Sequence, residues 1–229
     1  PLSPEIHTWK EVEHPGLVRL LETFSVPLED KPLHTEIWEW APVLSLRHRF
    51  NLARRRNWDR GYVDLYLDDI RELLDDLFSV LKFLHARKIA HGDVRAENIV
   101  IQQKLAEAPH AGLYRPSYRR NLKLIDPAPR TSLNHDQVLL GVLIYELLTG
   151  QLPVAGCSWP EERYPFLGKG LDDVLKRAMG VSTWPPFSDL AQMEHELKVA
   201  FDRGTGYNEK LFGKTPGYEG FFCESDAWS

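Results

Sequence analysis

The sequence has little of several features that would place it in common protein classes. Its two cysteines, Cys157 and Cys223, form no CxxC pair, and two cysteines cannot build the disulfide framework of a small secreted domain. No apolar run approaches the roughly 18 residues that a membrane span needs. The formal net charge is −5, which argues against a nucleic-acid binder held by bulk electrostatics. We therefore expect a cytoplasmic protein with no membrane span and no nucleic-acid partner.

The rest of the composition is that of an ordinary globular protein. The chain has 229 residues, of which 43% are hydrophobic and 27% charged, enough for one large domain or two small ones. Residue 1 is proline rather than methionine, so we expect a processed product or a fragment. No signal peptide is visible at the N-terminus.

The first forty residues predict a helix followed by a strand hairpin. Ser3 is a candidate N-cap for a helix over Pro4–Glu13, with proline at the first helical position. Strand-like patterns follow over Leu17–Val26 and His34–Trp40, separated by a polar turn. An antiparallel pairing of these two segments is the simplest expectation.

The remainder is mainly helical. Leucines and isoleucine recur at steps of three and four over Leu65–Arg87, which predicts a long amphipathic helix. Residues 136–148 are apolar nearly all round, so that helix should be buried. Two more helices are expected over residues 171–179 and 187–201, and two short strands over residues 99–101 and 122–125. Residues 102–121 read as an insertion, and 204–229 as a Gly- and aromatic-rich surface tail without a period.

A polar loop between the short apolar runs at residues 89–90 and 99–101 holds the candidate chemistry. It contains Asp93, Arg95 and Asn98, and the second short strand ends in Asp126. Two acids and an amide beside strand ends are a typical oxygen-ligand set for Mg²⁺, which keeps room for phosphates. Arg95 could neutralise phosphate charge and Asp93 could deprotonate a hydroxyl. Taken singly, Asp93 and Asn98 could equally be turn caps.

The order of these elements resembles the protein kinases. Their pattern is H-R-D-x-x-x-x-N, then D-F-G, then a buried helix opening D-x-W-S-x-G. This chain has HGDVRAEN over residues 91–98, IDPA over 125–128, and DQVLLG over 136–141 followed by VLIYELLTG. The resemblance covers about residues 4–200. It implies an α+β protein-kinase-like fold with a mainly helical C-lobe and a small, incomplete β-rich N-lobe.

The resemblance also implies roles for individual residues, with ATP and Mg²⁺ as cofactors. Asp93 matches the catalytic base, and Arg95 the position that faces the transferred phosphate. Asn98 and Asp126 match the two metal ligands.

Further matches concern the N-lobe and the structural anchors of the catalytic loop. The segment Trp38-Glu39-Trp40-Ala41 looks like the hinge that contacts adenine, with Glu39 and Ala41 as nucleotide-binding positions. Glu5 matches the N-lobe helix glutamate. The implied division is a partial N-lobe over residues 1–41, a C-lobe over 42–203 and a tail over 204–229. His91 and Asp136 match anchors of the catalytic loop.

Four departures separate this chain from ordinary protein kinases. No Gly-rich loop or V-A-I-K strand is present, so Glu5 has no lysine partner. Ten residues separate Asp126 from Asp136, which reach at most about 35 Å and leave no room for a peptide-docking platform. Gly92 replaces the arginine that grips a phosphorylated activation loop. Pro127 fixes the backbone after Asp126 and should restrain its movement.

Two hypotheses follow, and a third alternative is a helical domain unrelated to kinases. The favoured one is a pseudokinase, a regulatory or scaffolding module with a protein partner and retained nucleotide and Mg²⁺ binding. The other is an active, atypical phosphotransferase, because the base and both metal ligands survive. HGDxxxxN followed by a short segment also resembles aminoglycoside and choline kinases and the small atypical kinases of the Bud32 type.

Overall fold

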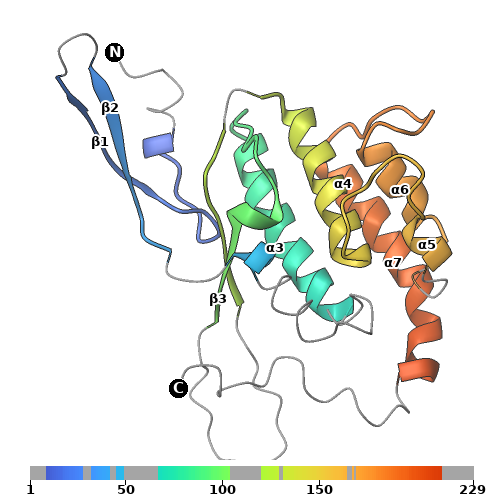
Figure 1. Cartoon of the computed structure of the whole chain (residues 1–229). Helices are drawn as coiled ribbons and strands as arrows, with labels where there is room; N and C mark the ends of the chain where they lie inside the picture. The colour runs from blue at the N-terminus through green and yellow to red at the C-terminus, as the bar shows by residue number, and fades with distance from the viewer. Residues whose placement is uncertain are drawn as a thin grey trace, which may run out of the picture.

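The computed structural model describes residues 9–27, 32–41, 45–48, 67–103, 120–128, 131–163, 167 and 169–212. These residues form three parts, which Figure 1 shows side by side. A two-stranded hairpin projects at one end, a second small sheet lies next to it, and a body of helices makes up the rest. The α+β class expected from the sequence is confirmed.

The projecting hairpin pairs β1 (Leu20–Val26) with β2 (Leu33–Trp38) in antiparallel register. The first strand starts three residues later than the sequence predicted. Residues 16–18 bond instead to β4 (Arg120–Leu124) of the second sheet. The N–H of Leu124 donates to the carbonyl of Gly16 at 2.8 Å, and the N–H of Val18 donates to the carbonyl of Leu124 at 3.2 Å. The segment before the hairpin therefore ties it to the rest of the molecule.

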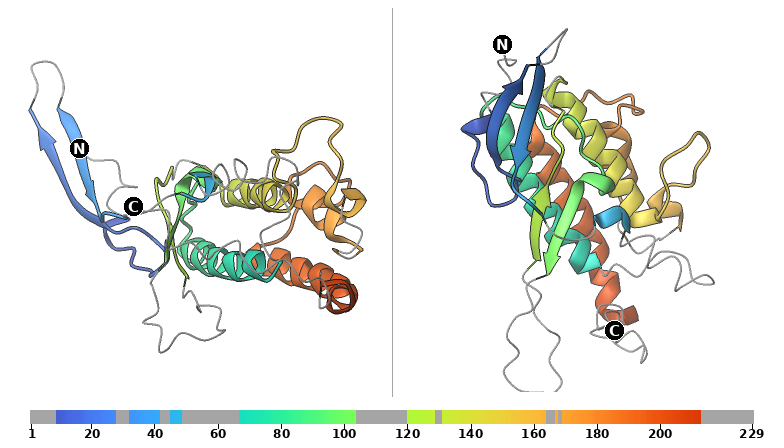
Figure 2. Two further views of the ribbon diagram at one scale, coloured as in Figure 1. Left: turned by 60° about the horizontal axis from the view of Figure 1, so that its bottom comes forward. Right: turned by 60° about the vertical axis from the view of Figure 1, so that its left-hand side comes forward.

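The second sheet pairs β3 (Ile99–Gln103) with β4, and Ile99 lies opposite Leu124. Leu17 bridges to β4 on one side of this pair and Ser45 bridges to Val100 of β3 on the other. Figure 2 shows the small sheet between the hairpin and the helices. It therefore joins the two halves of the chain. Most of the expected insertion, residues 104–119, lies outside the described part.

The helical body buries the apolar stripes that the sequence pattern predicted. Its longer helices are α3 (Leu67–His85), α4 (Leu133–Thr149) and α7 (Leu190–Phe212), and the shorter ones are α5 (Pro160–Arg163) and α6 (Leu171–Ala178). Helix α3 packs against α4, α7 and β4, while α6 packs between α4 and α7. Side chains from several elements are almost completely enclosed in one core, among them Leu77, Leu81, Leu84, Ile99, Leu124, Leu140, Ile144 and Leu171. None of the described helices is both long and apolar enough to cross a bilayer.

Helix α7 differs from the sequence prediction at both ends. It begins at Leu190 because the carboxylate of Asp189 accepts a hydrogen bond from the N–H of Gln192 at 2.8 Å, the geometry of an N-cap. It continues to Phe212, so residues 204–212, in which the sequence shows no clear period, are helical. A helix already nucleated gains one backbone hydrogen bond per added residue, which here outweighs the poor helix propensity of glycine. The domain boundary predicted at residue 204 falls inside this helix.

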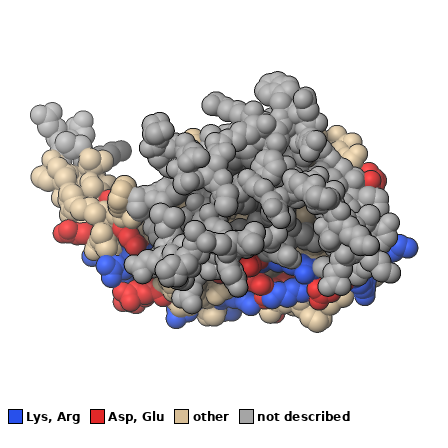
Figure 3. Space-filling view, turned by 90° about the horizontal axis from the view of Figure 1, so that it is seen from below, with Lys and Arg blue, Asp and Glu red and all other residues tan. Residues whose placement is uncertain are grey.

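Two sequence predictions at the chain ends extend beyond the described residues. Only the end of the expected N-terminal helix, Trp9 and Lys10, is described as helical, and Glu5 lies outside the described part. Residues 213–229 of the expected tail also lie outside the described part. On the face shown in Figure 3, the described Lys and Arg side chains lie interspersed with Asp and Glu, so this part of the surface presents no field of one sign.

Candidate functional site

The polar loop over residues 91–98 brings three of the predicted site residues into contact. Nδ2 of Asn98 donates to a carboxylate oxygen of Asp93 at 2.7 Å and to its backbone carbonyl at 3.0 Å. Nε of Arg95 lies 3.1 Å from the other carboxylate oxygen of Asp93. Asn98 is buried and Asp93 is partly open. Because Asn98 uses its amide nitrogen for Asp93, its side-chain oxygen stays available as a ligand.

Asp126 lies next to this loop in a strained backbone conformation. The N–H of Ile125 donates to the carbonyl of Asn98 at 2.9 Å, so Asp126 follows directly after a bond to the loop. Its φ is +52°, in the left-handed region, which non-glycine residues rarely adopt and which is common at functional sites. Within the described part of the chain, its exposed carboxylate has no hydrogen-bond or ion-pair partner. Asp126 therefore presents an exposed carboxylate one residue after the backbone bond to Asn98.

These oxygens are ligands of the kind that hard cations such as Mg²⁺ prefer. Among the described residues, no group of three or more His, Cys, Asp or Glu side chains could hold a metal by itself. An amide oxygen and one carboxylate are enough for Mg²⁺, which takes its other ligands from water and phosphate. The pair is unsuited to zinc, which prefers a closed set of nitrogen and sulfur ligands.

The start of the loop is hydrogen-bonded to Asp136 of α4. This carboxylate is completely enclosed and accepts hydrogen bonds from the N–H groups of His91, at 2.8 Å, and Gly92, at 2.7 Å. It also lies 2.8 Å from Nε2 of His85 at the end of α3. One buried side chain therefore joins two helices to the start of the loop, as the sequence led us to expect of an anchor.

The segment after Asp126 lies directly on the loop. The N–H of Ala128 donates to the carbonyl of His91 at 2.6 Å. Gly92 has φ +82°, and a Cβ built on it would lie 1.9 Å from the carbonyl oxygen of Ala128. Helix α4 begins only a few residues later, at Leu133. The short connection leaves no space for a side chain at position 92, which gives a physical reason for glycine there.

An aromatic row lies beneath the same loop. The ring of Trp9 is 6.3 Å from that of Trp38 and 6.3 Å from that of His91, edge to face in both cases. Trp9 and His91 are both buried. Burial lowers the pKa of His91 to about 4, although the carboxylates of Asp136 and Asp93 act in the opposite direction. The imidazole is therefore neutral at physiological pH and serves as a packing residue.

Glu39, in the segment expected to be the hinge, forms an ion pair with Lys123 that the sequence did not predict. Both carboxylate oxygens of Glu39 accept hydrogen bonds from Nζ of Lys123, at 3.1 and 3.2 Å. Burial alone would raise the pKa of Glu39, but Lys123 and Arg19 together outweigh it and hold that pKa below its usual value. The N–H of Glu39 donates to the carbonyl of Arg19 at 2.7 Å.

Comparison with known proteins supports the kinase resemblance. No protein-family model matches the chain. It is 30% identical over 104 residues to calcium-dependent protein kinase 3 of Plasmodium yoelii yoelii, covering 45% of this chain and 17% of that protein. It is 26% identical over 162 residues to the serine/threonine-protein kinase Pkn1 of Myxococcus xanthus, covering 56% and 23%. The chain thus spans less than a quarter of the length of these relatives.

Solved structures show the fold. The kinase domain of Mycobacterium tuberculosis PknI matches with a TM-score of 0.58 and 17% identity, over 85% of this chain and 75% of that one. A double mutant of that domain matches with a TM-score of 0.60. The chain therefore has a protein-kinase-like fold.

We expect Gly92→Ala to destabilise the protein by about 3 kcal/mol or more, because a methyl group there adds a steric overlap to the strain of a positive φ. Gly156→Ala is the matched control, since Gly156 has φ +77° with no atom within 4 Å of its Cβ position, and should cost about 1 kcal/mol. Urea unfolding of both variants measures the difference. Equal losses would contradict the close contact with Ala128.

The buried neutral His91 predicts a pH dependence of stability. Its folded pKa of about 4 lies below the unfolded value of 6.5, so protons bind preferentially to the unfolded chain as the pH falls below 6.5. The free energy of unfolding should decrease by about 1 kcal/mol between pH 7.5 and 5.5 from this group alone. Denaturant titrations should show this decrease in the unmutated chain and not in His91→Gln. The control variant His34→Gln, which changes an exposed histidine, should still show the decrease. An unchanged slope in His91→Gln contradicts the assignment.

Proposed function

We propose that this chain is a pseudokinase: a kinase-fold binding module that holds Mg²⁺ and a nucleotide and acts through a protein partner instead of phosphorylating peptides. The observation that carries the proposal is the contact of Ala128 with Gly92. Because only a few residues lie between Ala128 and the start of α4 at Leu133, this connection is too short to form the surface on which protein kinases dock a peptide. The low cysteine count supports an intracellular setting.

The retained ligands support the nucleotide and metal part of the proposal. Asn98 and Asp126 would hold the cation, which neutralises phosphate charge when bound. Arg95 is exposed enough to turn from Asp93 toward a phosphate. The Glu39 carbonyl and the backbone of Ala41 would contact the base. Residues 1–229 contain no Gly-rich loop and no V-A-I-K strand, so these contacts would suffice for binding but leave the phosphates poorly oriented for transfer.

A second candidate function is an active phosphotransferase with a small hydroxyl substrate. Asp93 favours it, because Asn98 and Arg95 fix its carboxylate while about a third of its side chain stays open. A carboxylate so oriented can accept a proton from a hydroxyl. A small substrate needs no peptide platform, so the short connection does not oppose this function.

A thermal-shift titration followed by a transfer assay tests the proposal. Mg²⁺–ATP at 100 times its dissociation constant should stabilise the chain by about 3 kcal/mol, which is roughly 5–10 °C for a protein of this size. Asp126→Ala should lose the shift that depends on Mg²⁺. No γ-phosphate should pass to the chain itself, to a mixture of basic proteins, or to aminoglycosides and choline.

Two results would contradict the proposal in different ways. Absence of any shift with Mg²⁺–ATP contradicts nucleotide and metal binding. Transfer of γ-phosphate that disappears in Asp93→Ala contradicts the pseudokinase assignment and supports the second candidate.

A further inference from the structure

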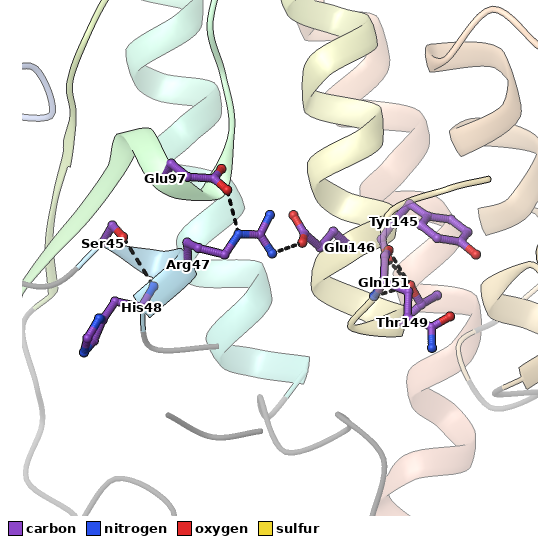
Figure 4. Close-up of polar contacts among 8 residues, drawn as sticks. All are labelled: Ser45, Arg47, His48, Glu97, Tyr145, Glu146, Thr149 and Gln151. Carbon is purple, nitrogen blue, oxygen red and sulfur yellow. Dashed lines mark hydrogen bonds and ion pairs between the residues drawn. The ribbon is translucent and has the colours of Figure 1, made fainter. Parts of the chain in front are cut away.

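A single arginine joins three separate parts of the chain beside the site. Figure 4 shows Arg47 between two acidic residues that come from different elements. Its Nε donates to a carboxylate oxygen of Glu97 at 2.7 Å, and its Nη1 donates to the carboxylate of Glu146 in α4. Glu146 is nearly enclosed, with 4% of its side chain exposed. Neither the sequence pattern nor the kinase resemblance pointed to this residue.

The backbone around Arg47 is fixed independently of these ion pairs. Ser45 forms a bridge to Val100 of β3, and its hydroxyl accepts a hydrogen bond from the N–H of His48 at 3.3 Å. Leu46 is buried in the main core. The guanidinium is therefore delivered from a short, anchored helical turn rather than from a free surface loop.

Glu97 connects this guanidinium to the proposed cation site. It belongs to the 3-10 turn η1 (Ala96–Asn98), and the next residue is Asn98. The turn presents the Asn98 side chain to Asp93, and the carbonyl of Asn98 accepts a hydrogen bond from Ile125, next to Asp126. A contact that fixes Glu97 thus restrains the turn on which both candidate metal ligands depend.

The chemistry of the contact requires arginine. Within the described residues, Arg47 is the one cation paired with Glu146, and a buried carboxylate without a partner is strongly unfavourable. The planar fork of a guanidinium can bond two carboxylates in different directions, whereas a lysine ammonium is a point charge on a flexible stem. Glu146 therefore holds Arg47 in place, and Arg47 in turn holds Glu97.

We propose that Arg47 is a positioning residue for the cation site: clamped by Glu146, it orients Glu97 and thereby the turn that presents Asn98. This role rests on the proposed function only for the ligand that Asn98 would bind. The coupling between Arg47 and the turn is a property of the protein alone, so it can be measured without nucleotide.

Amide hydrogen exchange of the whole chain tests the coupling. The variants are Arg47→Met, the double variant Arg47→Met with Glu146→Gln, and Arg177→Met. Arg177 is the matched control, because it makes a half-buried ion pair with Glu196 at 2.8 Å between α6 and α7, with no contact to the loop. The double variant removes the orphaned buried charge, so it separates lost positioning from lost stability.

In Arg47→Met, the amides of Asn98 and Ile125 should exchange about ten-fold faster. Local opening of the turn then no longer costs the free energy of breaking the contact between Arg47 and Glu97. Arg177→Met should leave these two amides within about two-fold of the unmutated chain. The double variant should regain global stability and keep the fast exchange at Asn98 and Ile125. A further variant, Arg47→Ala, leaves the space between the two carboxylates empty. Millimolar guanidinium, but not sodium, should fill that space and slow the exchange of Asn98 and Ile125 in it.

Unchanged exchange at Asn98 and Ile125 in Arg47→Met overturns the role of Arg47. So does a double variant that recovers slow exchange, because Arg47 would then only neutralise Glu146. A parallel titration with Mg²⁺–ATP keeps the two proposals apart. Affinity should fall about ten-fold in Arg47→Met, whereas an unmutated chain that binds no Mg²⁺–ATP overturns the proposed function while the exchange data still decide the coupling.

Discussion

The enclosed carboxylate of Asp136 is the constraint on which the site depends. It accepts the two N–H groups that open the 91–98 loop and meets His85 from α3. Because a buried carboxylate must have its hydrogen bonds satisfied, the loop cannot leave α4 without exposing a charge to an apolar interior. The geometry of the loop is thereby set by the helical body and not by a bound ligand.

The close connection over Gly92 follows from this arrangement. With the loop held against α4, the backbone of Ala128 lies on its start and excludes any side chain at position 92. Asp126, two residues before Ala128, has a positive φ and an exposed carboxylate. The proposed function rests on these two features, the close contact at Gly92 and the exposed carboxylate that follows the Asn98 loop.

Local sequence patterns predicted much of this, and long-range contacts explain the rest. Short-range spacing in the sequence predicted helix α3, the buried helix α4 and the grouping of Asp93 with Asn98. The pairs of Arg47 with Glu97 and Glu146, and of Lys123 with Glu39, join residues 50 to 99 positions apart, and no local pattern marks them. The extension of α7 through Gly204 was missed because propensity argues against it.

The most direct test of the central claim uses Mn²⁺ in place of Mg²⁺ with ATP, followed by amide NMR of the whole chain. A cation between Asn98 and Asp126 should broaden the resonances of Ile99, Ile125 and their neighbours. The broadening should vanish in Asp126→Ala, whose fold the anchor at Asp136 should preserve. Broadening elsewhere on the chain, or equal broadening in Asp126→Ala, would contradict the claim that these two residues form the retained cation site.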